Sequence, residues 1–257
     1  MNLFFTPFFY YYCTRLKSTS KFISWIIIYL APLILSVFIF SSDLVKLQIL
    51  LLTIVCSHNL YEIGYIQNDT ETIKKEYNPT LRLTLAQLSF YEKNKSIVYI
   101  VRFLISIFLT VTIVFYYDSL YIYCVWLITP IFFIYNLIRS RLNLLLHFIL
   151  VFCRYCLPVF ISTGSYSLTL LMILCFPLPN LLERASEKRF GFFFYRSLLK
   201  DKISSFRVFY YLCMTAFCFV LYFRGSSKEE LTIVVMLVFY TFYRSLILFK
   251  EKISRSV

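Results

Sequence analysis

Eight long apolar segments constrain this chain more than any other feature of its sequence. Each is close to the roughly 20 residues that an α-helix needs to cross the hydrocarbon core of a bilayer. They are continuous runs of Leu, Ile, Phe and Val, without the alternation of a membrane β-strand. The segments are Phe22–Phe40, Leu44–Tyr61, Ile97–Tyr116, Leu120–Ile138, Leu142–Ile161, Ser165–Leu182, Phe206–Phe223 and Leu231–Phe249. We therefore expect an all-α, polytopic membrane helix bundle of about eight or nine spans.

The composition excludes a soluble domain. Hydrophobic residues make up 60% of the chain and charged residues only 15%, whereas a soluble domain has about a quarter of its positions charged. The aromatic run Phe4–Tyr12 precedes the first span, lacks the pattern of a cleaved signal and is expected at the membrane interface. We expect one integral membrane domain, 1–257, in which half-repeats of about 22–138 and 142–249 enclose a central cavity.

The Lys and Arg residues predict the orientation. They concentrate in the N-terminal tail, in the second, fourth and sixth connections and in the C-terminal tail, while the first, third and fifth connections are nearly free of cations. The positive-inside rule then places both termini on the cytoplasmic side of the cell membrane. The net charge of +13 is explained mainly by this topology. Because no soluble basic domain or nucleic-acid motif is present, a nucleic-acid partner is not expected.

Two acidic stretches occur at matching places in the two halves. YEIGYIQNDTETIKKE (61–76) and NLLERASEKR (180–189) each lie at the predicted cytoplasmic end of the second span of a half. Ionisable residues at a membrane boundary are costly unless they are solvated or functional. The duplicated arrangement favours a polar site between helices. Two solvated helix ends with local ion pairs are the alternative.

The first stretch has the spacing of one helical face. His58, Glu62, Asp69, Thr72 and Glu76 step by three, four or seven residues, so a continuing helix would align them as a polar stripe that leads from the membrane into the loop. A stripe that contains carboxylates is suited to cations.

The second stretch mixes carboxylates with cations. Glu183 and Glu187 lie four residues apart, and Arg184, Lys188 and Arg189 flank them. Mg²⁺ prefers a few carboxylates together with substrate phosphates and water, and Arg or Lys takes the remaining phosphate charge. The two stretches together predict a site for a Mg²⁺-bound diphosphate.

Three further groups of polar residues lie in apolar helices. Arg154 falls near the middle of the fifth span and should face the bundle interior, where a structural partner and a role near the lipid phosphate are the two alternatives. His58 and His147 are expected to be packed, neutral imidazoles. Arg102 and Arg244 lie near predicted cytoplasmic helix ends, where their side chains can extend to the interface.

These stretches resemble the two acidic motifs of the UbiA superfamily of intramembrane prenyltransferases. Asn68 and Asp69 match the start of that family's N-D-x-x-D-x-x-x-D motif, Glu76 stands at its last Asp, and Thr72 replaces the middle Asp. ERASE, 183–187, is similar to the family's D-x-x-x-D. NPTLR (78–82) and IYNLIRSRLN (134–143) resemble segments that often accompany these motifs. The family usually has nine spans, and about eight are visible here.

The resemblance implies a Mg²⁺-assisted transfer in which pyrophosphate leaves. Its catalytic and metal-binding residues would be Asp69, Glu76, Glu183 and Glu187. Its substrate-binding residues would be Asn68, Thr72, Arg82, Arg139, Arg141, Arg154, Arg184, Lys188 and Arg189. The expected partners are a polyprenyl lipid, a diphosphate-activated donor and the bilayer.

The resemblance leaves the substrates open. Most family members transfer a prenyl group from its diphosphate to an aromatic or other acceptor, and a minority branch transfers phosphoribose from phosphoribosyl diphosphate to a polyprenyl phosphate. Six Lys and Arg residues face Glu183, Glu187 and Asp201 across the sixth connection, which favours the second reaction because it brings two phosphate-bearing substrates together. A flippase, transporter or non-catalytic scaffold is the alternative from another class.

Overall fold

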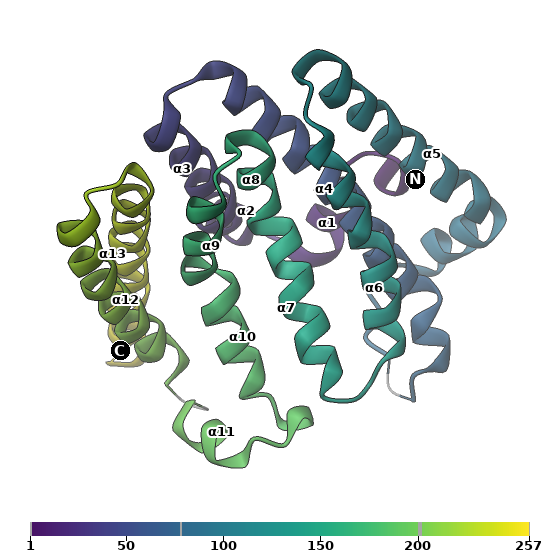
Figure 1. The fold of residues 1–257 in the computed structure, drawn as a ribbon. Coiled ribbons are helices and arrows are strands. Elements are labelled where there is room, and N and C mark those ends of the chain that lie inside the picture. Colours follow the sequence, from purple (N-terminus) through teal and green to yellow (C-terminus); the bar gives the residue numbers. More distant parts are fainter. Residues whose placement is uncertain (1, 78, 200–201, 257) are drawn as a thin grey trace.

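The chain forms a bundle of helices (Figure 1). The computed structural model describes residues 2–77, 79–199 and 202–256, so Asn78, Lys200 and Asp201 lie outside the described residues. Within these ranges all regular structure is helical, and eight helical stretches are long and apolar enough to cross a membrane. The predicted all-α, polytopic membrane bundle is confirmed.

The first four spans lie between residues 19 and 137. The first span, Thr19–Ser41, consists of α2 (Thr19–Trp25), a π-helical turn (Ile26–Leu30) and α3 (Ala31–Ser41). The second is α4 (Leu44–Thr70) with a 3-10 turn at Thr72–Lys75, and the third is α5 (Leu85–Tyr117). The fourth is a 3-10 helix, Leu120–Leu127, followed by α6 (Ile128–Leu137).

The other four spans lie between residues 142 and 253. They are α7 (Leu142–Tyr155) with α8 (Leu157–Thr163), α9 (Tyr166–Cys175) with α10 (Pro177–Ala185), α12 (Ile203–Gly225), and α13 (Lys228–Ser256). A 3-10 turn, Lys188–Phe190, and α11 (Phe193–Leu199) connect the sixth span to the seventh.

A helical segment precedes the predicted third span. α5 starts at Leu85, because Thr84 caps its first turn, and it is kinked at Asn94, close to the predicted start of the span at Ile97. The Thr84 hydroxyl accepts a hydrogen bond from the Gln87 amide at 3.3 Å, and the Gln87 side chain accepts one from the Thr84 amide at 2.9 Å. This capping box satisfies two amide groups that the helix leaves free. Much of the expected long connection is therefore helical.

Prolines interrupt two of the spans that line the candidate site described below. Pro158 lies at the junction of α7 and α8, and Pro177 at the junction of α9 and α10. A proline lacks the amide hydrogen and clashes with the preceding helical turn, so the α-helical hydrogen bonding is interrupted at each junction. Tyr155 and Phe176 lie next to these breaks, and their rings stack at 4.8 Å.

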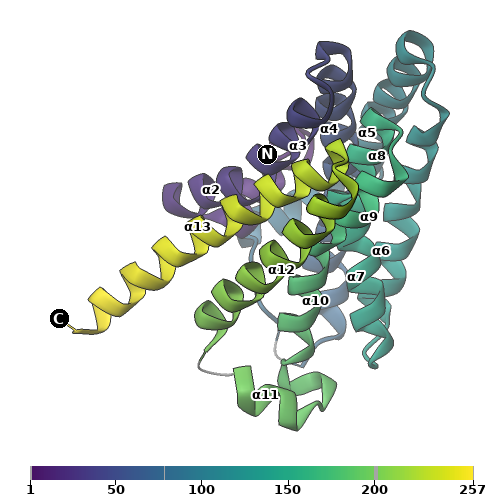
Figure 2. The same cartoon turned by 60° about the vertical axis from the view of Figure 1, so that its left-hand side comes forward.

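α4 is the central helix of the first half. It packs against α5, α6 and α8, and its backbone approaches α6 closely at Gly64, where an added Cβ would lie 2.2 Å from the Phe132 ring. The hairpin of α12 and α13 packs on α9 and α3. Figure 2 shows this hairpin in front of the bundle, with the C-terminal end of α13 extending beyond it.

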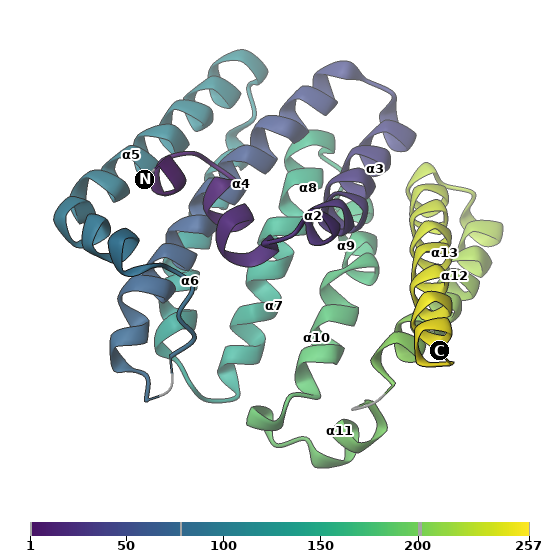
Figure 3. The same cartoon turned by 180° about the vertical axis from the view of Figure 1, so that it is seen from behind.

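The N-terminal segment, residues 2–16, packs against α4 and the bundle interior, which its aromatic composition alone does not predict. It contains a 3-10 turn (Asn2–Phe4), α1 (Phe9–Tyr11) and a π-helical turn (Tyr12–Leu16). Phe4 and Tyr10 are fully buried. Figure 3 shows this segment, in purple, against α4. It forms part of the wall of the candidate site.

Candidate functional site

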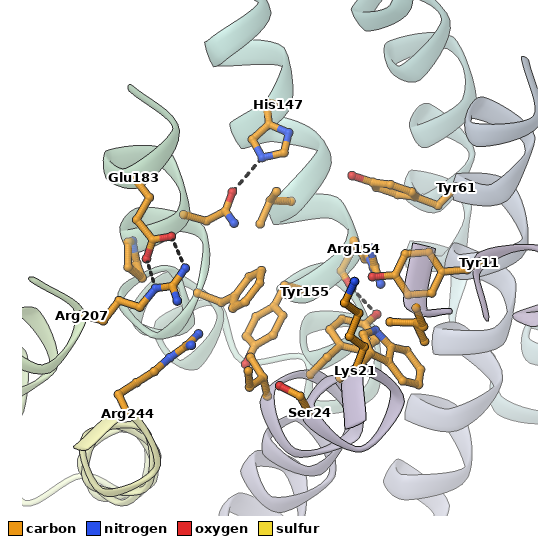
Figure 4. A pocket seen from close by; sticks show the side chains of 18 of the residues that line it. Tyr11, Lys21, Ser24, Tyr61, His147, Arg154, Tyr155, Glu183, Arg207 and Arg244 are labelled. Carbon is orange, nitrogen blue, oxygen red and sulfur yellow. Dashed lines mark hydrogen bonds and ion pairs between the residues drawn. The ribbon is translucent and has the colours of Figure 1, made fainter. Parts of the chain in front are cut away.

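A cavity of about 430 Å³ lies within the bundle, and we call it the central cavity. Figure 4 shows Arg154 and Tyr11 on one side of it and Glu183, Arg207 and Arg244 on the other. Its described lining residues are Tyr11, Leu16, Lys21, Ser24, Trp25, Ile28, Tyr29, Tyr61, Tyr65, His147, Val151, Arg154, Tyr155, Phe176, Pro179, Asn180, Glu183, Arg207, Tyr211 and Arg244. Four cations and one carboxylate face the same space, so the lining has a surplus of positive charge.

Arg154 faces the cavity from α7 inside an aromatic cage. Its guanidinium lies 4.9, 4.7 and 5.1 Å from the ring centres of Tyr11, Tyr29 and Tyr61. Cation–π contacts of this kind stabilise a desolvated cation. Among the described residues no carboxylate lies within ion-pair distance of Arg154, and its Nε has no hydrogen-bond partner. The expected interior partner is therefore a set of rings, and the charge itself is not neutralised.

Glu183 is held by an arginine on the other side of the cavity. Arg207 Nε and Nη2 donate to Glu183 Oε1 and Oε2 at 2.6 and 2.7 Å, a bidentate pair. Arg244 of α13 also faces the cavity, and its Nε has no hydrogen-bond partner. The sequence placed Arg244 at a helix end and did not single out Arg207. The signal that could have found them is a cation within each of the last two apolar spans.

A second cavity of about 360 Å³, here called the mouth cavity, adjoins the first. The two share Tyr61, Tyr65 and His147 among their lining residues. Of the described residues around the mouth cavity, Glu76 is the sole carboxylate, whereas five are arginines: Arg15, Arg82, Arg139, Arg184 and Arg189. Such a lining is complementary to phosphate groups.

Asp69 is the most enclosed of the four predicted metal ligands. The residue is 1% exposed, and its carboxylate accepts hydrogen bonds from Arg15 at 2.8 and 2.9 Å, from Arg82 at 3.2 Å and from the Tyr10 hydroxyl at 2.9 Å. Burial lowers the pKa of Arg15, but the hydrogen bonds and charge of Asp69 outweigh this effect and raise it. Burial and then the Asp69 charge raise the pKa of Tyr10 well above its usual value. Both partners therefore remain proton donors.

The other predicted ligands are paired with arginine as well. Glu76 binds Arg139 at 2.6 Å, and Glu187 binds Arg189 at 2.8 Å and Arg184 at 3.7 Å. Residues of both motifs line the mouth cavity, but their carboxylates are not gathered there, since Glu76 lines the mouth cavity and Glu183 the central cavity. Within the described ranges no group of three or more His, Cys, Asp or Glu side chains could hold a metal ion. As arranged, these carboxylates do not fit Mg²⁺, because each is bound by a guanidinium group and they are not gathered around one point.

Some of the predicted substrate-binding residues line one of the two cavities, and the others line neither. Asn68, Arg82, Arg139, Arg184 and Arg189 line the mouth cavity, and Arg154 lines the central one. Thr72, Arg141 and Lys188 are not among the described lining residues of either cavity. Thr72 is buried, and Arg141 lies over the Phe192 ring at 5.2 Å.

Glu62 and Arg102 hold the N-terminal segment. Both side chains are fully buried, and Arg102 Nη1 lies 2.7 Å from Glu62 Oε2. Glu62 accepts hydrogen bonds from the backbone amides of Phe8 and Tyr11, at 3.0 and 2.6 Å. Arg102 donates to the carbonyl oxygens of Leu3, Phe4 and Thr6. Arg102 therefore does not extend to the interface, and Glu62 serves the architecture of the site.

The two histidines differ in their surroundings. His58 is fully buried, lies 4.3 Å from the Phe8 ring and has no hydrogen-bond partner on either nitrogen, as expected for a packed side chain. His147 lines both cavities, and its Nε2 lies 2.7 Å from Asn180 Oδ1. His147 therefore faces the site instead of the apolar core.

Comparison of the chain with protein-family models, with curated proteins and with solved structures finds no match in any of the three. The fold and the site together define a class: a polytopic α-helical membrane protein with a cationic interior cavity.

Proposed function

We propose that the protein is a UbiA-like membrane transferase that transfers 5-phosphoribose from phosphoribosyl diphosphate to a polyprenyl phosphate, with release of pyrophosphate. The product would be a lipid-linked sugar donor for cell-envelope polysaccharide synthesis. The supporting observation is the pair of adjoining cavities, each lined by more cations than carboxylates. Two phosphorylated substrates that meet in one reaction need such a surplus of positive charge.

The arginines of the mouth cavity supply the electrostatic part of this chemistry. As the bond to pyrophosphate breaks, negative charge grows on the leaving group. Arg139, Arg184 and Arg189 already face the mouth cavity, so they can stabilise this charge without reorganisation. The ion pairs with Glu76 and Glu187 hold these guanidinium groups in place. In the resembling family Mg²⁺ supplies this stabilisation, and the arginine-paired carboxylates described above do not fit the ion.

We also propose that the mouth cavity and both termini face the cytoplasm and that the membrane is the cell membrane. The connections at residues 42–43, 118–119 and 164–165 contain no Lys or Arg, and the seventh connection holds Arg224 and Lys228 beside Glu229 and Glu230. At the other end, residues 138–141 and 186–199 carry Arg139, Arg141, Lys188, Arg189 and Arg196. This asymmetry follows the positive-inside rule. It also puts the mouth cavity within reach of soluble phosphate esters.

One observation favours a second candidate, a non-catalytic membrane protein that binds the same phosphorylated lipids. All four carboxylates that resemble the family's metal ligands are bound by arginines. A flippase or scaffold would need the cationic cavity but no metal-assisted bond cleavage. The two candidates differ in whether pyrophosphate appears.

The experiment uses purified protein and two substrate mixtures. The first contains labelled phosphoribosyl diphosphate with a polyprenyl phosphate, and the second contains labelled prenyl diphosphate with aromatic acids. Each is run with Mg²⁺ and with EDTA. We expect label in the lipid fraction and free pyrophosphate from the first mixture, both lost in an Arg184→Gln, Arg189→Gln variant. Turnover in the second mixture alone would replace this proposal with prenyl transfer, and binding of lipid phosphate without pyrophosphate release would favour the non-catalytic candidate.

A further inference from the structure

An apolar groove adjoins the central cavity on the side of the N-terminal segment. It encloses about 340 Å³, and we call it the aromatic groove. Its described lining residues are Thr6, Pro7, Phe8, Phe9, Tyr11, Tyr12, Leu16, Phe22 and Trp25. Tyr11, Leu16 and Trp25 also line the central cavity, so the two spaces meet at these side chains. No Lys, Arg, Asp or Glu is among the described residues of the groove.

Arg154 lies at the junction of these two spaces. Tyr11, whose ring is 4.9 Å from the Arg154 guanidinium, is itself a wall of the groove. Lys21 of α2 lines the central cavity and forms no ion pair within the described part of the chain. Figure 4 shows Lys21 on the same side of the cavity as Arg154 and Tyr11. An anion placed here would meet two cations that no carboxylate neutralises.

The three adjoining spaces thus differ in character. The aromatic groove is apolar, its junction with the central cavity is cationic, and the mouth cavity is rich in arginine. A soluble polyanion is excluded from the groove because nothing there replaces its hydration. An amphiphile with one anionic head and a hydrocarbon chain matches the groove and the junction together.

We propose that the aromatic groove holds the hydrocarbon chain of a phosphorylated isoprenoid lipid and that Arg154 and Lys21 bind its phosphate. The soluble diphosphate then occupies the mouth cavity, on the arginines. This assignment deepens the proposed function, on which it rests for the identity of the lipid as a substrate. It assigns Tyr11 two contacts, one with the Arg154 guanidinium and one with the first part of the chain.

The test measures binding and needs no turnover. The probes are farnesyl phosphate and inorganic pyrophosphate, titrated separately into the purified full-length protein in detergent. Trp25 lines both the groove and the central cavity, so its fluorescence in a Trp126→Phe background reports occupation of the junction. We expect Arg154→Gln to lower the affinity for farnesyl phosphate about tenfold or more, as for loss of a charged hydrogen bond. The same variant should change the affinity for pyrophosphate less than twofold. Arg189→Gln should show the reverse pattern.

Two further variants keep the test decisive if Arg154→Gln fails to fold. Lys21 and Phe9 are both exposed, so changes there leave the packing of the bundle intact. Lys21→Gln should lower the affinity for farnesyl phosphate several-fold. Phe9→Asp should lower the affinity for farnesyl phosphate more than the affinity for isopentenyl phosphate, because only the longer chain reaches far into the groove.

The outcomes separate this inference from the proposed function. A selective loss of farnesyl phosphate binding in these variants supports the inference, even if no transfer is ever detected. Unchanged farnesyl phosphate affinity in Lys21→Gln and Phe9→Asp overturns it, even if transfer is detected. A wild-type protein that binds neither probe contradicts the inference and the proposed function together.

Discussion

At the scale of single residues, pairing with arginine decides what the acidic side chains can do. A carboxylate that shares its oxygen atoms with two guanidinium groups fixes the position of those groups, and its own charge is largely offset. Asp69 is the clearest case, since Arg15 and Arg82 both bind it. Its first role in this structure is to position two cations of the mouth cavity.

We expect Asp69→Asn to destabilise the protein. The change leaves two enclosed guanidinium groups without a counter-charge, and removal of one partner from a buried pair costs about 3 kcal/mol or more. Thermal unfolding in detergent should therefore show a midpoint lowered by about 5 °C or more. The matched control is Glu92→Gln, which removes a half-exposed pair with Lys74 and should change stability by about 1 kcal/mol or less. Equal shifts in the two variants would contradict the structural role of Asp69.

The sequence shows the carboxylates but not their partners. Glu62 and Asp69 could be placed on one helical face because their spacing is local. Arg15 precedes Asp69 by 54 residues, and Arg102 follows Glu62 by 40, and no pattern in the chain indicates that these residues meet. Only the docking of the N-terminal segment and the packing of α5 on α4 bring them together. Arg154 was predictable in position, since a charge in the middle of a span must face the interior.

At the scale of elements, the buried Glu62–Arg102 pair is one of two attachments of the N-terminal segment, and Asp69 with Tyr10 and Arg15 is the other. We expect Glu62→Gln to loosen the segment, because the amide is a weaker acceptor for the Phe8 and Tyr11 amides and leaves the buried Arg102 without a carboxylate. Hydrogen exchange in residues 2–16 should become about tenfold faster or more, which corresponds to about 1.4 kcal/mol. The α12–α13 hairpin serves as the internal control. Unchanged protection of residues 2–16, or equal loss in the hairpin, would contradict this role.

The contact between α4 and α6 gives a second prediction at this scale. Gly64→Ala would place a Cβ 2.2 Å from the Phe132 ring, so the helices must move apart, at a cost of about 1–3 kcal/mol. Gly225→Ala is the matched control, because the nearest atom to its Cβ is the flexible Glu230 carboxylate at 2.8 Å. Thermal unfolding should show a larger loss for Gly64→Ala, and Phe132→Leu should restore part of it. A larger loss at Gly225 would show that the helix contact is not tight.

The elements were predictable to different degrees. Apolar runs located all eight spans, because the bilayer sets their length. The early start of α5 had a local signal in Thr84 and Gln87, the two ends of a capping box. The buried position of the N-terminal segment had no such signal. An aromatic run suits both an interface and a packed interior, and the choice depends on partners far along the chain.

At the scale of the whole molecule, the fold separates two ends of different charge. Figure 1 shows the connections α3–α4, α8–α9 and α12–α13 at one end of the bundle and the α6–α7 connection with α11 at the other. The cationic connections and the mouth cavity lie at the second end. The central cavity could be predicted only in outline, as a polar site between helices. Its lining comes from six of the eight spans and from the N-terminal segment, so its charge depends on how all of them pack.

The orientation of the bundle is open to a direct test. One cysteine is introduced at Ser197 in α11, or at Ser226 between α12 and α13. In the parent protein Cys13, Cys124 and Cys213 are replaced by serine, because these three cysteines are not buried in the structure. Both new positions are exposed and lie at opposite ends of the seventh span. In intact cells, we expect a membrane-impermeant maleimide to label Ser226→Cys at once and to label Ser197→Cys only after the cells are opened. We expect this result because Ser197 lies at the arginine-rich end of the bundle, and the positive-inside rule places such an end in the cytoplasm. The parent without either new cysteine is the control for residual labelling. Labelling of Ser197→Cys from outside would invert the topology and would place the mouth cavity away from the soluble phosphate esters of the cell.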